Sequence, residues 1–250
     1  MTEFLWSKRG VIMKRKLLKV FLNVAIVASI MVMLNAAAEA LTIKYNNYLK
    51  TSEIEEVSKL LEESIQENNH SLDYYRNYYN NNNIVGSLKI EGTDIDTLLV
   101  QGDDNKYYLN HSIKNEYDEL GSVFVDYRTD LSSNQVNIYG HNSNVYDVIF
   151  KELENYLKED YYDEHKYIEV WNGDVTNIYE IFSVQIVTSD YEHYVVNPTD
   201  KKEHLRKLSN SIYQTEVITN ESDDILVIQT CLFNPSNSFL IINSRKVREV

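Results

Sequence analysis

The sequence predicts a mainly β fold, a closed or nearly closed barrel of about eight strands, with inserted helices and an N-terminal helical extension. From residue 84 onward, short segments rich in β-branched and aromatic residues alternate with turns such as Glu91-Gly92-Thr93. Before residue 84, apolar residues recur at helical spacing instead. Many short strands with few helices between them favour a barrel, because closing the sheet removes its open edges.

The predicted strands occupy most of the chain after residue 84. Each is bounded by turn residues and is short enough to cross a small barrel once. They cover residues 84–90, 95–101, 121–127, 135–139, 167–171, 178–187, 225–230 and 239–247. Apolar residues at helical spacing predict two inserted helices, at 145–158 and at 200–213.

Residues 41–83 are predicted to form the helical extension and a linker. Ser52 and Glu55 have the spacing of a capping box, in which two side chains satisfy free N–H groups at a helix start. The apolar residues that follow lie on one helical face, which indicates a surface helix packed on the domain. The Asn-rich stretch 77–83 is typical of a linker, so the barrel domain is expected to cover residues 84–250.

The N-terminus has the pattern of a membrane anchor. Residues 1–19 hold six basic residues and one acid, and residues 20–38 carry no formal charge. Nineteen mostly apolar residues come close to the length that crosses a bilayer. The positive-inside rule places the basic segment 1–19 in the cytoplasm and the rest of the chain outside. The alternative is a signal peptide cleaved near Ala36 to Ala40, which also exports the chain.

The charge and the cysteine count exclude several classes of protein. A net charge of −14 repels a phosphate backbone, so nucleic acid is not an expected partner. The single cysteine, Cys231, rules out an intrachain disulfide. The sequence has no His-Glu-x-x-His zinc pattern and no phosphate-binding glycine loop, and we predict neither a metal nor a cofactor.

Cys231 and His141 are the candidate chemical groups. Cys231 follows the strand at 225–230, and the polar run after it indicates an exposed loop. It is either a small buried apolar residue or a reactive thiol held by a rigid strand. His141 follows Gly140 at the end of the strand at 135–139, where its imidazole can stabilise a thiolate or protonate a leaving amine. The other histidines lack this placement: His70, His111, His165, His193 and His204.

Several blocks of the sequence, in order, resemble the class B sortases. The resemblance covers roughly residues 84–247. It is carried by the blocks at 84–96, 100–102, 107–111, 121–128 and 179–184, by Tyr139-Gly140-His141-Asn142 and by Thr230-Cys231. It implies an eight-stranded sortase barrel whose cysteine attacks an Asn-Pro-x-Thr-like C-terminal sorting signal. The thioester is then resolved by an amine on a cell-wall precursor or a pilin.

The resemblance also implies roles for individual residues. Cys231 corresponds to the nucleophile and His141 to the acid/base. Thr230 is expected beside the substrate channel, whereas His111 matches a family block without matching a catalytic position. The expected partners are surface proteins that bear sorting signals, the amine acceptor and the membrane.

One departure from the family concerns the oxyanion site. The family has an arginine at the start of the last strand, where this sequence has Phe239. Arg245 lies six residues further on and matches a different family position. The sequence leaves open a slow or inactive enzyme, a replacement donor such as Arg128 or a backbone N–H after Cys231, and a different alignment of the loop. The rival function is a sortase-like barrel that binds sorting signals without cleaving them.

Overall fold

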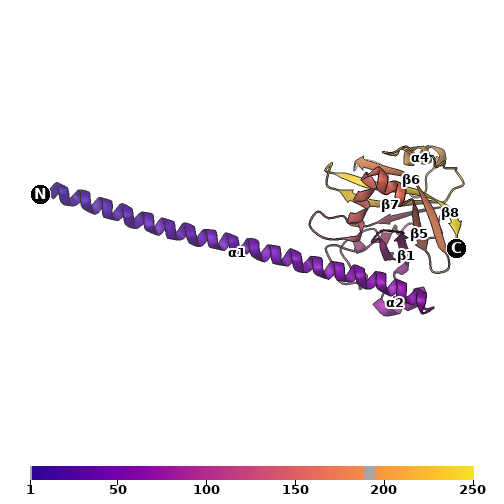
Figure 1. The fold of residues 1–250 in the computed structure, drawn as a ribbon, viewed down its shortest axis with the longest axis horizontal. Coiled ribbons are helices and arrows are strands. Elements are labelled where there is room, and N and C mark those ends of the chain that lie inside the picture. Colours follow the sequence, from indigo (N-terminus) through magenta and orange to yellow (C-terminus); the bar gives the residue numbers. More distant parts are fainter. Residues whose placement is uncertain (1, 189–194) are drawn as a thin grey trace. The chain divides into compact units, whose positions relative to one another are not determined.

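The structure is a computed structural model that describes residues 2–188 and 195–250 (Figure 1). The chain divides into two compact units, Met1–Leu49 and Lys50–Val250. The elements are α1 (Thr2–Gln66), α2 (Leu72–Tyr79), β1 (Ile84–Ile90), β2 (Asp96–Val100), η1 (Tyr107–Leu109), β3 (Phe124–Val125), β4 (Gln135–Tyr139), η2 (Ile149–Leu157), α3 (Glu159–Glu164), β5 (Tyr167–Trp171), β6 (Thr176–Thr188), α4 (Lys201–Leu208), β7 (Ile225–Leu232) and β8 (Ser238–Glu249).

The first unit consists of the N-terminal part of helix α1. Residues 13–42 are exposed along their whole length, although most of those between 20 and 38 are apolar. Within the described residues, one helix is long and apolar enough to cross a membrane, and it contains the predicted span at 20–38.

The second unit contains a closed barrel of eight strands among the described residues, in the order β1-β2-β3-β4-β7-β8-β6-β5. This confirms the predicted fold class. Neighbouring strands are antiparallel except for the pairs β2–β3 and β4–β7, which are parallel. Every strand contributes to one buried apolar cluster, which we call the barrel core. Burial of this apolar surface is the main force that closes the sheet.

Most strand boundaries agree with the sequence. Strands β1, β4 and β5 begin and end at the predicted residues. Strand β3 is much shorter than predicted. Before it, Ser122 N–H donates to the Tyr108 carbonyl (3.0 Å), and after it, Thr129 N–H donates to the Asp126 carbonyl (3.2 Å) in a turn. The insertion predicted at 145–158 is largely the 3₁₀ helix η2, and the helix predicted at 200–213 is the shorter α4.

The predicted helix start at Ser52 is wrong. Helix α1 runs from Thr2 to Gln66 without a break at this position. The Ser-x-x-Glu spacing is therefore incidental, because the N–H groups after Ser52 already bond within the helix. The apolar face that follows does pack on the domain, through Val57, Leu60 and Leu61.

The stretch at 77–83 is not a free linker. Tyr79 ends helix α2, and Asn80 adopts the left-handed conformation (φ 49°) that closes a helix. Asn81 is 1% exposed, and its amide donates to the Tyr108 hydroxyl (3.1 Å) and to the Ile113 carbonyl (2.8 Å). The asparagines thus form buried hydrogen bonds, and residues 50–83 belong to the same compact unit as the barrel.

Candidate active site

The parallel pair β4–β7 brings the two candidate residues to one edge of the barrel. Its register runs from Gln135 opposite Ile225 to Tyr139 opposite Gln229. Beyond the last pair the chains stay together, since Gly140 N–H donates to the Gln229 carbonyl (3.3 Å). Continued for two residues past Tyr139, this offset sets the backbone of His141 level with that of Cys231, and neighbouring strands lie about 4.8 Å apart.

Cys231 occupies the outer face of strand β7. Its side chain is exposed, whereas Thr230 and Leu232 on either side are buried. This alternation follows from the pleat, which directs successive side chains to opposite faces. Partial burial raises the pKa of the Cys231 thiol above its ordinary value, because desolvation penalises the thiolate.

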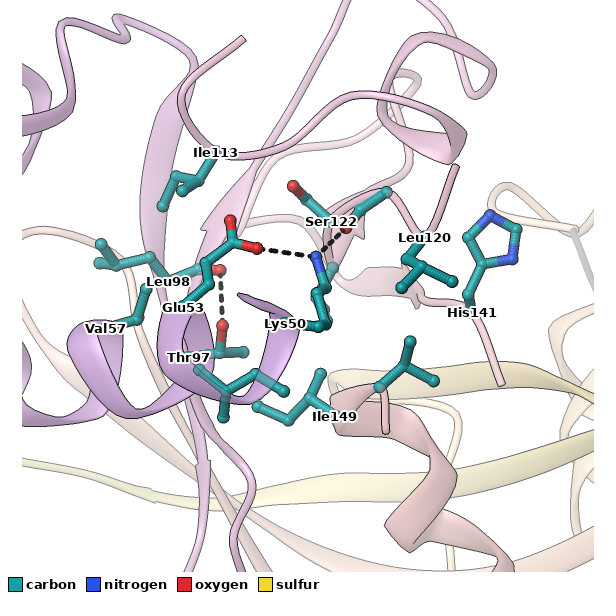
Figure 2. A pocket seen from close by; sticks show the side chains of 14 residues that line it. Lys50, Glu53, Val57, Thr97, Leu98, Ile113, Leu120, Ser122, His141 and Ile149 are labelled. Atoms are coloured by element: carbon teal, nitrogen blue, oxygen red, sulfur yellow. Dashed lines mark hydrogen bonds and ion pairs between the residues drawn. The ribbon is translucent and has the colours of Figure 1, made fainter. Parts of the chain in front are cut away.

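The half-buried His141 ring is held by a backbone carbonyl. Nε2 lies 2.7 Å from the carbonyl oxygen of Leu109, at the end of η1. A carbonyl only accepts hydrogen bonds, so Nε2 carries the proton in the neutral ring. Nδ1 has no hydrogen-bond partner in the part of the chain that the structure describes. Figure 2 shows the ring on the wall of a cavity of about 50 Å³ that Lys50 and Leu120 also line.

Asn142 connects the ends of the two strands. Its amide donates to the Cys231 carbonyl (2.9 Å) and to Glu154 Oε1 on η2 (2.6 Å). It is 6% exposed, so these bonds replace water that the amide loses on burial. Asn142 therefore fixes the backbone that carries the thiol. Asn142 was not among the predicted site residues, although its position directly after a strand-terminal histidine is a signal that could have identified it.

Thr230 faces the barrel interior. It is 2% exposed, and its hydroxyl donates to the Gly140 carbonyl (2.8 Å). This bond fixes the residue before His141. The prediction that Thr230 lies beside the substrate channel stays a prediction.

Phe239 stands directly across from Cys231 in the β7–β8 pair. This register places a half-buried aromatic ring at the position where the resemblance implies an arginine. Arg245 lies opposite Ile225 at the other end of β7, and it donates to Glu180 (2.9 Å). The last strand therefore brings no guanidinium to the Cys231 position.

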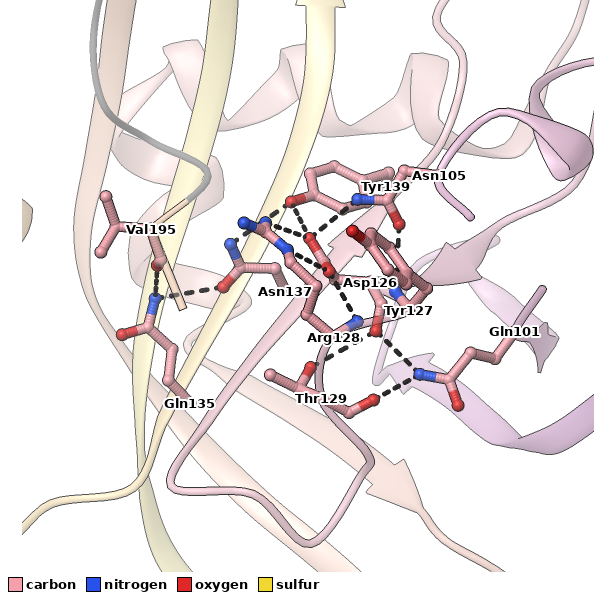
Figure 3. A network of polar contacts seen from close by, with 10 residues as sticks. All are labelled: Gln101, Asn105, Asp126, Tyr127, Arg128, Thr129, Gln135, Asn137, Tyr139 and Val195. Carbon is pink, nitrogen blue, oxygen red and sulfur yellow. Dashed lines mark hydrogen bonds and ion pairs between the residues drawn. The ribbon is translucent and has the colours of Figure 1, made fainter. Parts of the chain in front are cut away.

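Arg128 is held in a polar network next to strand β4 (Figure 3). Its guanidinium donates to both carboxylate oxygens of the buried Asp126, at 2.8 and 2.6 Å. Burial alone would raise the pKa of Asp126, but the bonds from Arg128 hold it below its ordinary value. Tyr139 donates to the same carboxylate (2.8 Å). Arg128 is thus engaged with Asp126, and its substrate role stays a prediction.

The remaining described histidines make structural contacts elsewhere. His70 packs on Trp171, His111 stacks on Tyr107, His165 bonds the Glu91 carbonyl, and His204 bonds Gln135. His193 lies outside the described residues. Within residues 2–188 and 195–250, no group of three or more His, Cys, Asp or Glu side chains is arranged to hold a metal ion.

A closed eight-stranded barrel with a cysteine and a histidine at the ends of adjacent parallel strands defines the class of sortase-like cysteine enzymes. The sortase domain model matches residues 88–247, and the chain belongs to the sortase family. It is 35% identical over 158 residues to sortase B of Listeria monocytogenes and 31% identical over 158 residues to sortase B of Staphylococcus aureus. Each match covers 60% of this chain and 63% or 64% of the relative.

A solved structure of Clostridium perfringens sortase B has the same fold. It is 26% identical and superimposes with a TM-score of 0.66, covering 71% of this chain and 100% of that one.

Proposed function

We propose that this protein is a membrane-anchored class B sortase, a cysteine transpeptidase that acts outside the cell. The β4–β7 pairing carries this proposal, because its offset, continued past Tyr139, sets the backbone of His141 level with that of Cys231. Membership of the sortase family and the similarity to two sortases B support the transpeptidase class.

The reaction begins with a proton transfer between the two side chains. The Cys231 thiol gives its proton to Nδ1 of His141, and the sulfur attacks the backbone carbonyl carbon of the threonine in the sorting signal. The carbon–nitrogen bond breaks, the imidazolium protonates the departing amine, and a thioester remains on Cys231. An incoming amine then gives a proton to His141, and its nitrogen bonds to the thioester carbonyl carbon. The carbon–sulfur bond breaks, and the sulfur takes the proton back from His141 to become the thiol again.

The oxyanion of each tetrahedral intermediate needs a donor that Phe239 cannot supply. Loss of one such donor typically lowers the rate by about 10²–10³. We therefore expect slow turnover. The Leu232 N–H and the Arg128 guanidinium are the two groups that could donate to the oxyanion instead.

The substrates and the location follow from the same proposal. The signal is an Asn-Pro-x-Thr-like sequence on a surface protein, and the acceptor is an amine on a cell-wall precursor or a pilin. The apolar part of α1 anchors the chain, with the basic segment 1–19 in the cytoplasm and the barrel outside. An anchored enzyme meets exported substrates as they leave the membrane.

The decisive experiment is acyl-enzyme trapping on the full chain in detergent. Incubation with an Asn-Pro-x-Thr peptide is expected to add the mass of the acyl fragment to the wild type. Cys231→Ala and His141→Ala should show no adduct. His165→Ala is the matched control, because its ring bonds the Glu91 carbonyl (3.0 Å) rather than η1 or the end of β7, and it should acylate normally. Cleavage of the peptide by Cys231→Ala would disprove the proposed mechanism.

The second candidate function is binding of sorting signals without cleavage. Phe239 opposite Cys231 favours it, because an apolar ring replaces the donor for the oxyanion. A thiol-selective methanethiosulfonate probe distinguishes the two functions. In an enzyme, Cys231 should react readily with the probe, and the signal peptide should both slow this labelling and form an acyl-enzyme. In a pure binding protein, the peptide should slow the labelling without forming an acyl-enzyme.

A further inference from the structure

We propose that Lys50 is a positioning residue for His141. It acts through the backbone of η1, which keeps the Leu109 carbonyl in place beneath the ring. The inference rests on the proposed function, because it assigns Nδ1 of His141 as the nitrogen that exchanges the proton with Cys231. It adds a residue from helix α1 to the machinery of the barrel.

Lys50 forms three hydrogen bonds at a nearly buried position. Its side chain is 11% exposed, and Nζ donates to Glu53 Oε2 (2.9 Å), Asp118 Oδ2 (2.8 Å) and the Gly121 carbonyl (2.9 Å). All three donor hydrogens of the ammonium are thus used. Two of the acceptors belong to the turn at 118–122, so Lys50 fixes this turn to the helix. Figure 2 shows the contact of Lys50 with Glu53.

The turn at 118–122 in turn fixes η1. Asp118 N–H donates to the Asn110 carbonyl (3.0 Å), and Ser122 N–H donates to the Tyr108 carbonyl (3.0 Å). Gly121 has a φ of +56°, and a Cβ added to it would lie 2.7 Å from the Leu109 carbonyl oxygen. The backbone of the turn therefore packs directly on the carbonyl that holds His141, with no side chain between them.

The last contact joins η1 to the catalytic ring. The Leu109 carbonyl accepts from His141 Nε2 at 2.7 Å. As long as this oxygen keeps its place, the neutral ring keeps its proton on Nε2, and Nδ1 is the basic nitrogen. The path from Lys50 to His141 consists of hydrogen bonds and close backbone contacts only, so a shift of the turn moves the acceptor.

The test uses the full chain in detergent micelles with ¹⁵N-labelled histidine. In the wild type, at a pH where the imidazole is neutral, the two His141 ring nitrogens should give the well-separated shifts of a single Nε2–H tautomer. In Lys50→Met the shifts should move toward the average of two tautomers. The kcat for the signal peptide should fall about ten-fold with KM within about two-fold, as expected for a misplaced acid/base.

Three further variants separate positioning from stability. Lys50→Arg keeps the charge and should restore the wild-type shifts and kcat. Asp118→Asn removes the charge on the other side of this ion pair and should shift the His141 signals and lower kcat as Lys50→Met does. If Lys50→Met does not fold, Asp118→Asn provides the test. Lys59→Met is the matched control, because Lys59 lies on the same helix, is 73% exposed and pairs with Glu63 of that helix (3.5 Å), and it should resemble the wild type.

Unchanged His141 shifts in a folded Lys50→Met protein, or in Asp118→Asn, would overturn the proposal. The nitrogen shifts do not depend on turnover. If the wild type forms no acyl-enzyme, the proposed function fails, while the shifts still decide whether Lys50 positions the ring.

Discussion

The two faces of strand β7 have opposite roles. Leu226 and Ile228 point into the barrel core with 0% exposure. On the outer face, Val227 packs under α4, and Cys231 is exposed at the end of the strand. One position along the chain therefore separates a residue that holds the barrel together from one that is available for chemistry.

The comparison shows what fixes each face. The inner face is defined by the strand itself, because burial in a closed barrel leaves only apolar side chains and Thr230 there. The outer face at Cys231 is defined by segments that come from elsewhere in the chain, namely the end of β4, η1, η2 and Phe239. The inner face should therefore respond to substitution in stability, and the outer face at Cys231 in activity.

The largest contrast is expected between Ile228→Ala and Cys231→Ala. Ile228→Ala should lower the free energy of unfolding by about 2–5 kcal/mol, because it opens a cavity in the barrel core. Cys231→Ala should change stability by less than about 1 kcal/mol and should abolish acyl-enzyme formation. Urea unfolding and mass spectrometry measure the two effects. Equal losses of stability in the two variants would contradict the assignment of the faces.

Phe239→Arg should raise activity on the outer face. A guanidinium across from Cys231 can donate to the oxyanion, which is worth about 10²–10³ in kcat. Phe239→Gln removes the same ring without adding a charge and serves as the control. Peptide cleavage kinetics measure both variants. If Phe239→Arg gains nothing over Phe239→Gln, the donor for the oxyanion already exists elsewhere.

Thr230→Val should have a mixed effect, since Thr230 is an inner residue that contacts the site. The Gly140 carbonyl loses its partner at 2.8 Å, which should cost about 1 kcal/mol of stability. Because Gly140 precedes His141, kcat should also fall several-fold. Thermal melting and steady-state kinetics test this together. A loss of stability with an unchanged kcat would restrict Thr230 to the barrel core.

The smallest effect concerns the pH dependence of thiol alkylation in the absence of substrate. Burial raises the pKa of Cys231, so the thiolate fraction at neutral pH lies below that of an ordinary cysteine. The rate of alkylation by iodoacetamide should therefore increase with pH through a midpoint above the ordinary cysteine value. A midpoint near neutrality would mean that a cation stabilises the thiolate in the free protein.

The sequence predicted the barrel well because its signals are local. The alternation of β1, β4 and β5 and the turns around them define these strands without knowledge of their partners. The start of a helix at Ser52 was wrong because a capping pattern does not show whether the helix has already begun.

The candidate site was predictable only in part, because most of its contacts connect distant segments. Cys231 and His141 stood out at strand ends, but their common edge depends on a parallel pairing between segments ninety positions apart. Lys50 reaches acceptors 68 and 71 positions away, and no periodicity marks such a residue. The Leu109 contribution is a backbone carbonyl, which every residue type provides.

Phe239 also has a consequence for inhibitor selectivity. Anionic transition-state mimics gain affinity from a guanidinium next to the reactive sulfur, and the last strand of this protein offers an aromatic ring there instead. Neutral electrophiles that carry an aryl group beside the reactive carbon should stack on that ring and label Cys231 in preference to charged compounds. A compound series that differs only in this group would discriminate this protein from its own Phe239→Arg variant.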